Sequence, residues 1–262
     1  MPVRSSRFFT ISYLALTLFL LTVASPAVLA QNDPCQPDMA SCPAEGCNPN
    51  NNLDPLLNTR KNLNTPDNSV PQDVSVRWMK LRKDPKHYVT KGPRDELVTL
   101  GEGKLVRLTG WLLAVKPEHG ESCNCYLDTP ADTDNHLVLV TKTTINKFKL
   151  PANASKATLT AKFRQREPES ITAEFTPRLR AAGHPNFTNA FVQPILNTTA
   201  QGALWVRITG PVMFDSEHFV HNPLKRVNNW EVHPIFRFEY CPKDKTCVSD
   251  GTENWVDVDG VQ

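Results

Sequence analysis

One stretch of alternating residues constrains the fold of this chain more than any other, and it runs from Trp230 to Tyr240. Almost every second side chain is apolar or aromatic, while Glu231, His233 and Arg237 lie at alternate positions. This period of two predicts a strand with a buried face and a polar face that projects into solvent. Glu231 and His233 stand two residues apart, so we expect an acid and an imidazole to emerge side by side.

Two further segments each predict a long strand with a glycine in its middle. Residues 104–116 contain Val-Arg-Leu-Thr-Gly at positions 106–110, and Val-Arg-Ile-Thr-Gly recurs at positions 206–210. An internal glycine allows a long strand to bend across a small barrel. The two segments are therefore predicted to bend in the same way.

Shorter elements are predicted between the two bent strands. Residues 125–127 and 136–141 flank a polar turn and predict a hairpin. Alternating apolar residues predict further strands at 159–163, within an inserted region, and at 171–176.

Pro177 and Gly183 bound a predicted short helix that precedes the second bent strand. Five strands with a helix before the fourth is the plan of the oligonucleotide/oligosaccharide-binding (OB) barrel. The sequence thus predicts an all-β fold with one short helix, arranged as a five-stranded OB-like Greek-key barrel with an inserted strand and loop region.

Six short motifs follow one another within about residues 100–240. They are Thr-Gly-Trp at 109–111, Glu-Ser-Cys-Asn-Cys at 121–125, Thr-Pro-Arg at 176–178, Thr-Gly-Pro-Val-Met-Phe-Asp at 209–215, Glu-His at 217–218 and Trp-Glu-Val-His-Pro at 230–234. In these motifs the chain resembles a group of uncharacterised exported bacterial proteins with an OB-like core. The resemblance implies a fold and no particular reaction. Pro211 departs from the group's pattern, which has an aromatic or apolar residue there.

The ends of the chain are predicted to lie outside the barrel. Residues 1–30 have the charged start, apolar run and small-residue cleavage site of a signal peptide that ends near Ala30, with an uncleaved membrane anchor as the alternative. Residues 31–75, rich in Asn, Asp and Pro, predict a disordered polar leader. The barrel domain then spans 76–248, and 249–262 form an acidic flexible tail. The mature chain is expected to be periplasmic or secreted, without a transmembrane span.

Seven cysteines suit an oxidising compartment, and Cys241 and Cys247 are predicted to form a disulfide. The odd number leaves one thiol free or paired with another chain. Cys123 and Cys125, with a nearby histidine, could alternatively bind zinc, although zinc sites favour two to four residues between their cysteines.

Acidic, basic and imidazole side chains supply the candidates for chemistry. The catalytic candidates are His136, Glu174, Arg178, Glu231 and His233. A divalent metal would be held by nitrogen and oxygen ligands, and its candidate ligands are His136, His218, Glu231 and His233. The competing interpretation is structural, with His233 bonded to a neighbouring carboxylate and Glu231 paired with Arg237.

The outward face of the first bent strand offers a second candidate site, for ligand binding. Arg107, Thr109 and Trp111 share strand parity there, and partial burial under the leader is the alternative. Basic residues between 142 and 166 could contact phosphates, although such a run usually solvates an insertion. The net charge of +2 does not favour nucleic acid as the partner.

The sequence contains no Gly-rich phosphate loop, no nucleophile elbow and no helical His-Glu zinc motif. The leading hypothesis is therefore an exported OB-like binding or interaction module for an envelope or extracellular ligand, with no cofactor. The second is a metal-assisted hydrolase of a phosphodiester or similar ester, which uses a divalent metal. The third is a structural envelope protein whose polar cluster only stabilises the fold.

Overall fold

The computed structural model describes residues 35, 38–50, 52–66, 68–218 and 225–260. All of them lie in the unit Pro34–Gln262. The predicted signal peptide lies outside the described residues.

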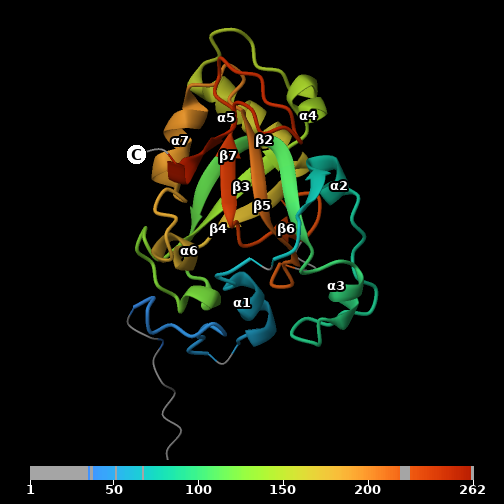
Figure 1. The fold of residues 1–262 in the computed structure, drawn as a ribbon, viewed down its shortest axis with the longest axis vertical. Helices are drawn as coiled ribbons and strands as arrows, with labels where there is room; N and C mark the ends of the chain where they lie inside the picture. Colours follow the sequence, from blue (N-terminus) through green and yellow to red (C-terminus); the bar gives the residue numbers. More distant parts are fainter. Residues whose placement is uncertain (1–34, 36–37, 51, 67, 219–224, 261–262) are drawn as a thin grey trace, which may run out of the picture. The chain divides into compact units, whose positions relative to one another are not determined.

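Five strands close into a barrel (Figure 1). They are β2 (Leu105–Glu118), β3 (Asp134–Val140), β4 (Ile171–Phe175), β5 (Leu204–Phe214) and β6 (Trp230–Val232). Their order is β2-β3-β4-β6-β5, and pairing between β2 and β5 closes the ring. Only the pairing of β4 with β6 is parallel among these five.

Three more strands extend the sheet outside the barrel. β1 (Gln72–Ser75) runs parallel to the first half of β2. β7 (Arg237–Tyr240) pairs with the first half of β5, and β8 (Val256–Asp257) pairs with β7. The predicted strand 230–240 is therefore two strands, β6 and β7, separated by a cis His233–Pro234 peptide bond.

The two predicted bent strands are confirmed as β2 and β5, the two longest strands of the barrel. β2 pairs with β5 through its first half and with β3 through its second. A Cβ atom on Gly110 would collide with Val76, and one on Gly210 would collide with the backbone carbonyl of Pro234. Both positions require glycine because another segment packs directly on the strand.

Seven short helices accompany the strands among the described residues, where the sequence predicts one. They are α1 (Pro55–Lys61), α2 (Val76–Lys80), α3 (Asp95–Thr99), α4 (Lys142–Lys147), α5 (Lys156–Arg166), α6 (Pro177–Ala181) and α7 (Asn189–Asn197). Except for α3, each follows an Asp, Ser or Thr whose side chain accepts a hydrogen bond from the first turn. The predicted helix after Pro177 is confirmed as α6.

Two predicted strands are wrong. Residues 159–163 belong to α5, where Leu159 and Phe163 lie four residues apart on one side of the helix. Residues 125–127 are not extended, because Cys125 and Tyr126 have left-handed backbone angles, φ 54° and 59°, and lie in a turn after the 3₁₀ helix η1 (Ser122–Asn124).

The segments predicted to be a disordered leader and a flexible tail contain ordered structure. Residues 31–75 include α1 and β1, and the disulfides Cys35–Cys47 and Cys42–Cys125 fix the part before them. Residues 249–262 include β8 and a 3₁₀ helix, η3 (Val258–Gly260), in which Val258 is fully buried. Covalent bonds and a few buried side chains order segments whose composition alone is polar.

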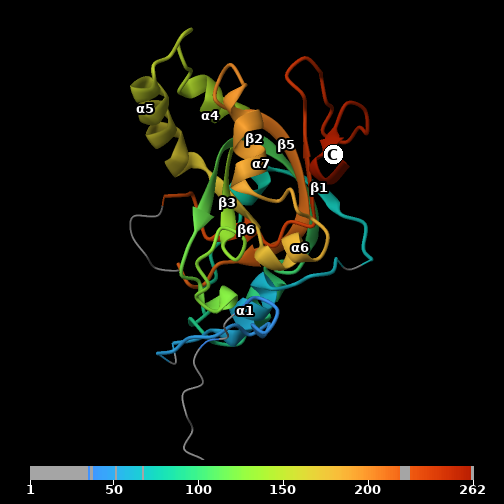
Figure 2. The same ribbon diagram turned by 90° about the vertical axis from the view of Figure 1, so that its left-hand side faces the viewer.

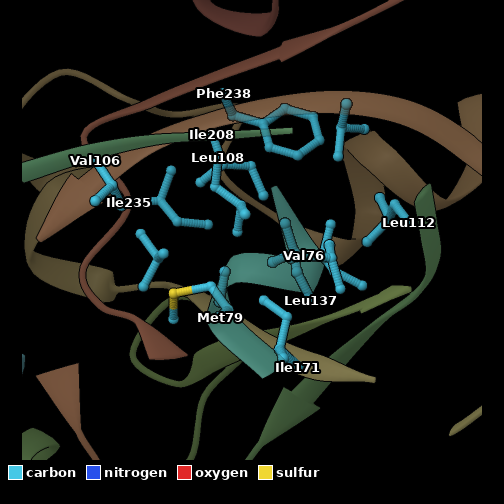
Figure 3. Packing of buried hydrophobic residues seen from close by; sticks show 14 of the residues in the cluster. Val76, Met79, Val106, Leu108, Leu112, Leu137, Ile171, Ile208, Ile235 and Phe238 are labelled. Atoms are coloured by element: carbon cyan, nitrogen blue, oxygen red, sulfur yellow. The ribbon is translucent and has the colours of Figure 1, made fainter. Parts of the chain in front are cut away.

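The hydrophobic core fills the inside of the barrel and extends to the helices that pack against the barrel. Figure 3 shows Val76 and Met79 of α2 pointing into the same apolar cluster as Leu108, Leu137 and Ile208. α7 packs against β2, as Figure 2 also shows. In both ribbon views α1 lies at the end of the barrel below β6.

Candidate functional site

The outer face of β3, β4 and β6 carries a cluster of acids and imidazoles. Alternate residues of these strands, such as Leu137 and Ala173, point into the core, so their neighbours in sequence point outward. His136 on β3 lies opposite Glu174 on β4, and Thr172 on β4 lies opposite Glu231 on β6. We call the resulting set the carboxylate–imidazole cluster; it consists of Glu118, Asp134, His136, Glu174, Glu231 and His233.

The prediction that Glu231 and His233 project into solvent is wrong, since both side chains are 0% exposed. Their strand parity is as predicted, but other segments cover the face. Asn124, from η1, donates a hydrogen bond to Asp134 Oδ1 (3.0 Å), and Arg226 donates one to Glu231 Oε2 (2.8 Å). The periodicity of a strand identifies its polar face but says nothing of what packs on it.

His136 faces two carboxylates with one nitrogen atom. Its Nε2 lies 2.5 Å from Glu174 Oε1 and also contacts Glu118 Oε2. A ring nitrogen carries at most one hydrogen, so it can donate to only one of these oxygens. Two carboxylates at one imidazole nitrogen therefore exceed what a single hydrogen bond can satisfy.

His233 lies among three carboxylates without a hydrogen bond. Its Nδ1 is 3.0 Å from Glu174 Oε2 and 3.3 Å from Glu231 Oε1, and its Nε2 is 3.8 Å from Asp134 Oδ2. Within the described part of the chain, neither ring nitrogen and none of these three oxygens has a partner in hydrogen-bond geometry. Each buried polar group left in this state costs about 1–3 kcal/mol. Folded proteins rarely leave several together without water, an ion or a ligand between them.

The surroundings of the cluster are rich in negative charge. Two permanent cations, Lys61 and Arg226, form ion pairs with this region, Lys61 through Glu121 at 2.6 Å. They face six carboxylates, those of Glu118, Glu121, Asp134, Glu174, Asp215 and Glu231. Arg178 and Arg180 also interact electrostatically with Asp134. Protons or a bound cation could supply further balance.

The ionisation of the cluster follows from this excess of acid. Burial lowers the pKa of His136, but the surrounding carboxylates, first Glu174 and then Glu118 and Glu121, together outweigh burial and the pKa rises to about 9. Burial raises the pKa of Glu118 to about 7, although His136 opposes that shift. Protons on these groups supply part of the positive charge that balances the carboxylates.

Three groups of ligand atoms are compact enough to hold a metal ion, with all atoms of a group within 4.8 Å of one another. They are Glu118, His136 and Glu174; Asp134, Glu174 and His233; and Glu121, Cys123 and Asp134. The last is the least suitable, because Lys61 already pairs with Glu121. Burial also raises the pKa of the Cys123 thiol well above its usual value, and only the thiolate binds metals well.

The side chains of His218 and Arg178 have other partners. His218 Nδ1 lies 2.6 Å from Asp215 Oδ2, a hydrogen bond that raises the pKa of His218 to about 9. Arg178 donates to the backbone carbonyls of Cys42 and Pro43 and so fixes the N-terminal segment. Neither belongs to the three groups of ligand atoms.

The predicted binding residues Arg107, Thr109 and Trp111 lie on the first half of β2 and do not belong to the carboxylate–imidazole cluster; Trp111 is in register with Val140 at the end of β3. Arg107 forms a bidentate ion pair with Asp73 of β1, and Thr109 is buried. Trp111 is half-buried and packs on Trp205, with ring centroids 5.2 Å apart. β1, which belongs to the predicted leader, packs beside Arg107 and Thr109 and covers them.

Disulfide pairing resolves the cysteine predictions. The Cys241–Cys247 disulfide is confirmed. The zinc alternative for Cys123 and Cys125 is wrong, because Cys125 is bonded to Cys42. Cys123 is the odd thiol and is buried.

Sequence reasoning missed five charged residues around the cluster: Lys61, Glu118, Glu121, Asp215 and Arg226. Glu121 and Asp215 had a signal, since they begin and end the motifs at 121–125 and 209–215. Glu118 ends β2 beyond the predicted strand, and Lys61 and Arg226 lie outside strands.

The cluster is accessible from solvent on one side only. The side chains of Glu118 and His136 are 25% and 24% exposed, whereas those of Asp134, Glu174 and His233 are at most 2% exposed. Glu118 and His136 line a cleft of about 510 Å³ together with Lys116, Lys225 and Arg226.

Comparison of the chain with models of protein families, with curated proteins and with solved structures finds no match. Among the helices of the described residues, not one has the length and apolarity that crossing a bilayer requires.

Proposed function

We propose that this protein is an exported OB-like module that binds a divalent cation in its carboxylate–imidazole cluster. One observation carries the proposal. His233 and three carboxylate oxygens of Asp134, Glu174 and Glu231 are buried together without hydrogen-bond partners in the described structure. A divalent cation among them would interact with ring nitrogen and carboxylate oxygen at once and would offset the excess negative charge.

The position of the cluster in the barrel supports an OB-like assignment. The closed order β2-β3-β4-β6-β5, with α6 and α7 before the fourth barrel strand, matches the OB plan. OB barrels bind ligands on their second and third strands and on the loops after the first and fourth. The cluster lies on β3 and β4, and the segments after β2 and β5 contribute Glu121 and Arg226 beside it.

Export is supported by the disulfides and by the predicted signal peptide. Three disulfides join six of the seven cysteines. Disulfides persist in secreted and periplasmic proteins and are rare in the cytosol. A cation taken up by this protein would therefore come from the envelope or the extracellular medium.

The donor atoms indicate which cations fit. Asp134, Glu174 and His233 offer oxygen and imidazole nitrogen, a combination typical of Zn²⁺, Mn²⁺ and Fe²⁺ sites. Ca²⁺ and Mg²⁺ prefer oxygen ligands alone. We therefore expect a transition-metal ion.

Metal analysis of the full chain, purified without chelator, tests the proposal. We expect at least one Zn²⁺ or Mn²⁺ per chain, a fall in melting temperature on adding EDTA, and recovery when Mn²⁺ or Zn²⁺ is restored. Glu174→Gln should lose the ion and become insensitive to EDTA, because the amide has no charge and a weaker donor oxygen.

Glu102→Gln is the matched control. Glu102 is as buried as Glu174 but pairs with Arg94 at 2.5 Å, outside the cluster. This variant should lower the melting temperature and retain the ion. A wild-type protein without bound metal, whose melting temperature responds to neither EDTA nor Mn²⁺ nor Zn²⁺, would instead identify the cluster as purely structural.

A further inference from the structure

We infer that Glu174 bridges two divalent cations and that the protein hydrolyses phosphate esters at the outer of the two. This inference rests on the proposed cation binding and specifies its stoichiometry and its substrate class. It starts from the fact that Glu174 belongs to two of the compact ligand groups.

The two oxygens of Glu174 face different imidazoles. Oε1 lies 2.5 Å from His136 Nε2, and Oε2 lies 3.0 Å from His233 Nδ1. A carboxylate so placed can give one oxygen to each of two ions. Bridged ions of this kind lie about 3.5–4 Å apart in enzymes that cleave phosphate esters.

The outer position is formed by Glu118, His136 and Glu174. His136 Nε2 contacts both carboxylates, which is more than one N–H group can satisfy. On a tetrahedral ion with bonds of about 2.1 Å, the ligand atoms are about 3.4 Å apart, so the three groups need only a small outward shift to surround one. An ion would thus replace a crowded contact with three coordination bonds.

The two positions differ in access to solvent. The inner position is formed by Asp134, Glu174 and His233, and all three residues are buried. At the outer one, the side chains of Glu118 and His136 are about a quarter exposed and border the cleft. A catalytic ion needs an open coordination position for water or substrate, whereas an enclosed ion supplies charge and orients its ligands.

The charges along the cleft indicate the substrate class. Lys116, Lys225 and Arg226 line it together with Glu118 and His136 of the outer position. Lys116 pairs with Glu167 at 2.5 Å and Arg226 with Glu231 at 2.8 Å, while Lys225 is exposed. Fixed cations beside a pair of divalent ions suit a substrate with a negatively charged reacting group, as in phosphate mono- and diesters.

The reaction is hydrolysis and needs only water as co-reactant. The oxygen of one water molecule forms a bond to phosphorus, and the bond between phosphorus and the alcohol oxygen breaks. A proton from the same water ends on the alcohol. A diester thus yields an alcohol and a phosphate monoester, without oxidation or reduction.

Metal stoichiometry and hydrolysis together test the inference. The full chain is loaded with Mn²⁺ and assayed with bis-p-nitrophenyl phosphate and with p-nitrophenyl phosphate. We expect two Mn²⁺ per chain in the wild type and one in His136→Ala. Hydrolysis by this variant should fall by a factor of at least about 100, because the ion next to the cleft is lost. His87→Ala, at an exposed histidine outside the cluster, should retain both ions and full activity.

Each outcome bears on a different part of the inference. One Mn²⁺ in the wild type, unaffected by His136→Ala, would overturn the second ion while the proposed function stands. No bound ion at all would overturn both. Two ions without hydrolysis of either ester would overturn the activity. An ion retained by His136→Ala would show that this variant is folded. Glu118→Gln is a second variant of the outer position and should also weaken Mn²⁺ binding there.

Discussion

At the scale of single residues, Glu174 lies at the centre of the polar chemistry of this protein. It faces an imidazole on either side and is almost fully buried. Its pKa lies well below the usual range: burial raises it, but His136 and then His233 together lower it more. A carboxylate that stays ionised in such a place requires positive charge close by, and protonated imidazoles of His136 and His233 provide it.

A residue-scale prediction concerns Asp73, whose carboxylate accepts two hydrogen bonds from Arg107, at 2.5 and 2.8 Å. The Arg107 hydrogen bonds lower the pKa of Asp73, so the pair stabilises the fold above the unfolded pKa of about 3.9 and loses that effect in acid. Asp73→Asn should reduce the free energy of unfolding by about 0.5 kcal/mol at pH 7, since the carboxylate is half exposed.

Urea unfolding of wild type and Asp73→Asn at pH 7 and at pH 3 measures this difference. The two proteins should approach one another in stability at the lower pH. Asp84→Asn, at an exposed carboxylate, should change stability at neither pH. A difference between Asp73→Asn and wild type that grows on acidification would contradict the assigned ion pair.

Individual residues of the site were predictable only where a strand placed them. Glu231 and His233 were identified from strand parity, His136 and Glu174 were candidates within predicted strands, and the structure brings these four together. Lys61 could not be identified, because it lies in a polar segment and approaches Glu121 across 60 positions of sequence. Parity is a local property, whereas an ion pair of this kind depends on tertiary packing.

At the scale of elements, the alternation of apolar and polar residues predicted strands well where both faces of the strand contact protein, and poorly elsewhere. β2, β4 and β5 lie where the sequence predicted them. The error at α5 arose because Leu159 and Phe163 satisfy both a period of two and an i, i+4 spacing. Ser155 caps that helix and was the available signal for it.

An element-scale prediction concerns the contact between β5 and the turn after β6. Gly210→Ala would place a methyl group against the Pro234 carbonyl and the Val232 side chain, so β5 and this turn would have to separate. The loss in unfolding free energy should be about 1–3 kcal/mol. His233 precedes Pro234 directly, so the variant should also bind Mn²⁺ more weakly.

Thermal or urea unfolding and a Mn²⁺ titration measure these two effects. Gly260→Ala is the control, because the nearest atom to its added Cβ is 4.0 Å away. That change should stay within about 0.5 kcal/mol of wild type. Equal stability of the two variants would show that the β5 contact is less tight than described.

At the scale of the whole molecule, disulfides connect distant parts of the sequence by loops of very different length. Cys42 and Cys125 are 83 positions apart, whereas Cys241 and Cys247 are separated by 6. A cross-link restricts the unfolded chain more when it closes a longer loop. The Cys42–Cys125 bond is therefore expected to contribute more to stability.

Replacing both cysteines of a pair by serine tests this expectation. C42S/C125S should lose about 4–5 kcal/mol, and C241S/C247S about 2–3 kcal/mol. Urea unfolding of each variant under oxidising conditions gives the two values. A larger loss from the short loop would mean that local strain or packing, and not loop closure, determines the effect.

The barrel itself was predictable from the order of its strands, and the surrounding layer was not. The sequence indicated five strands and a helix before the fourth, but the pairing of β1 with β2 and of β8 with β7 joins segments whose composition predicts disorder. Short strands of this kind have little hydrophobic pattern of their own. They are ordered by the sheet edge that they extend and by the disulfides nearby.

The disulfide between Cys42 and Cys125 would also affect how the proposed ion enters and leaves. It ties the N-terminal segment covalently to the loop that contributes Glu121 and Asn124, so this loop could move away from Asp134 only together with that segment. An ion at the proposed inner position would then exchange with the medium past Glu118 and His136, whose side chains are about a quarter exposed. An ion held in the interior would leave slowly, and only after the position nearer the medium had been vacated.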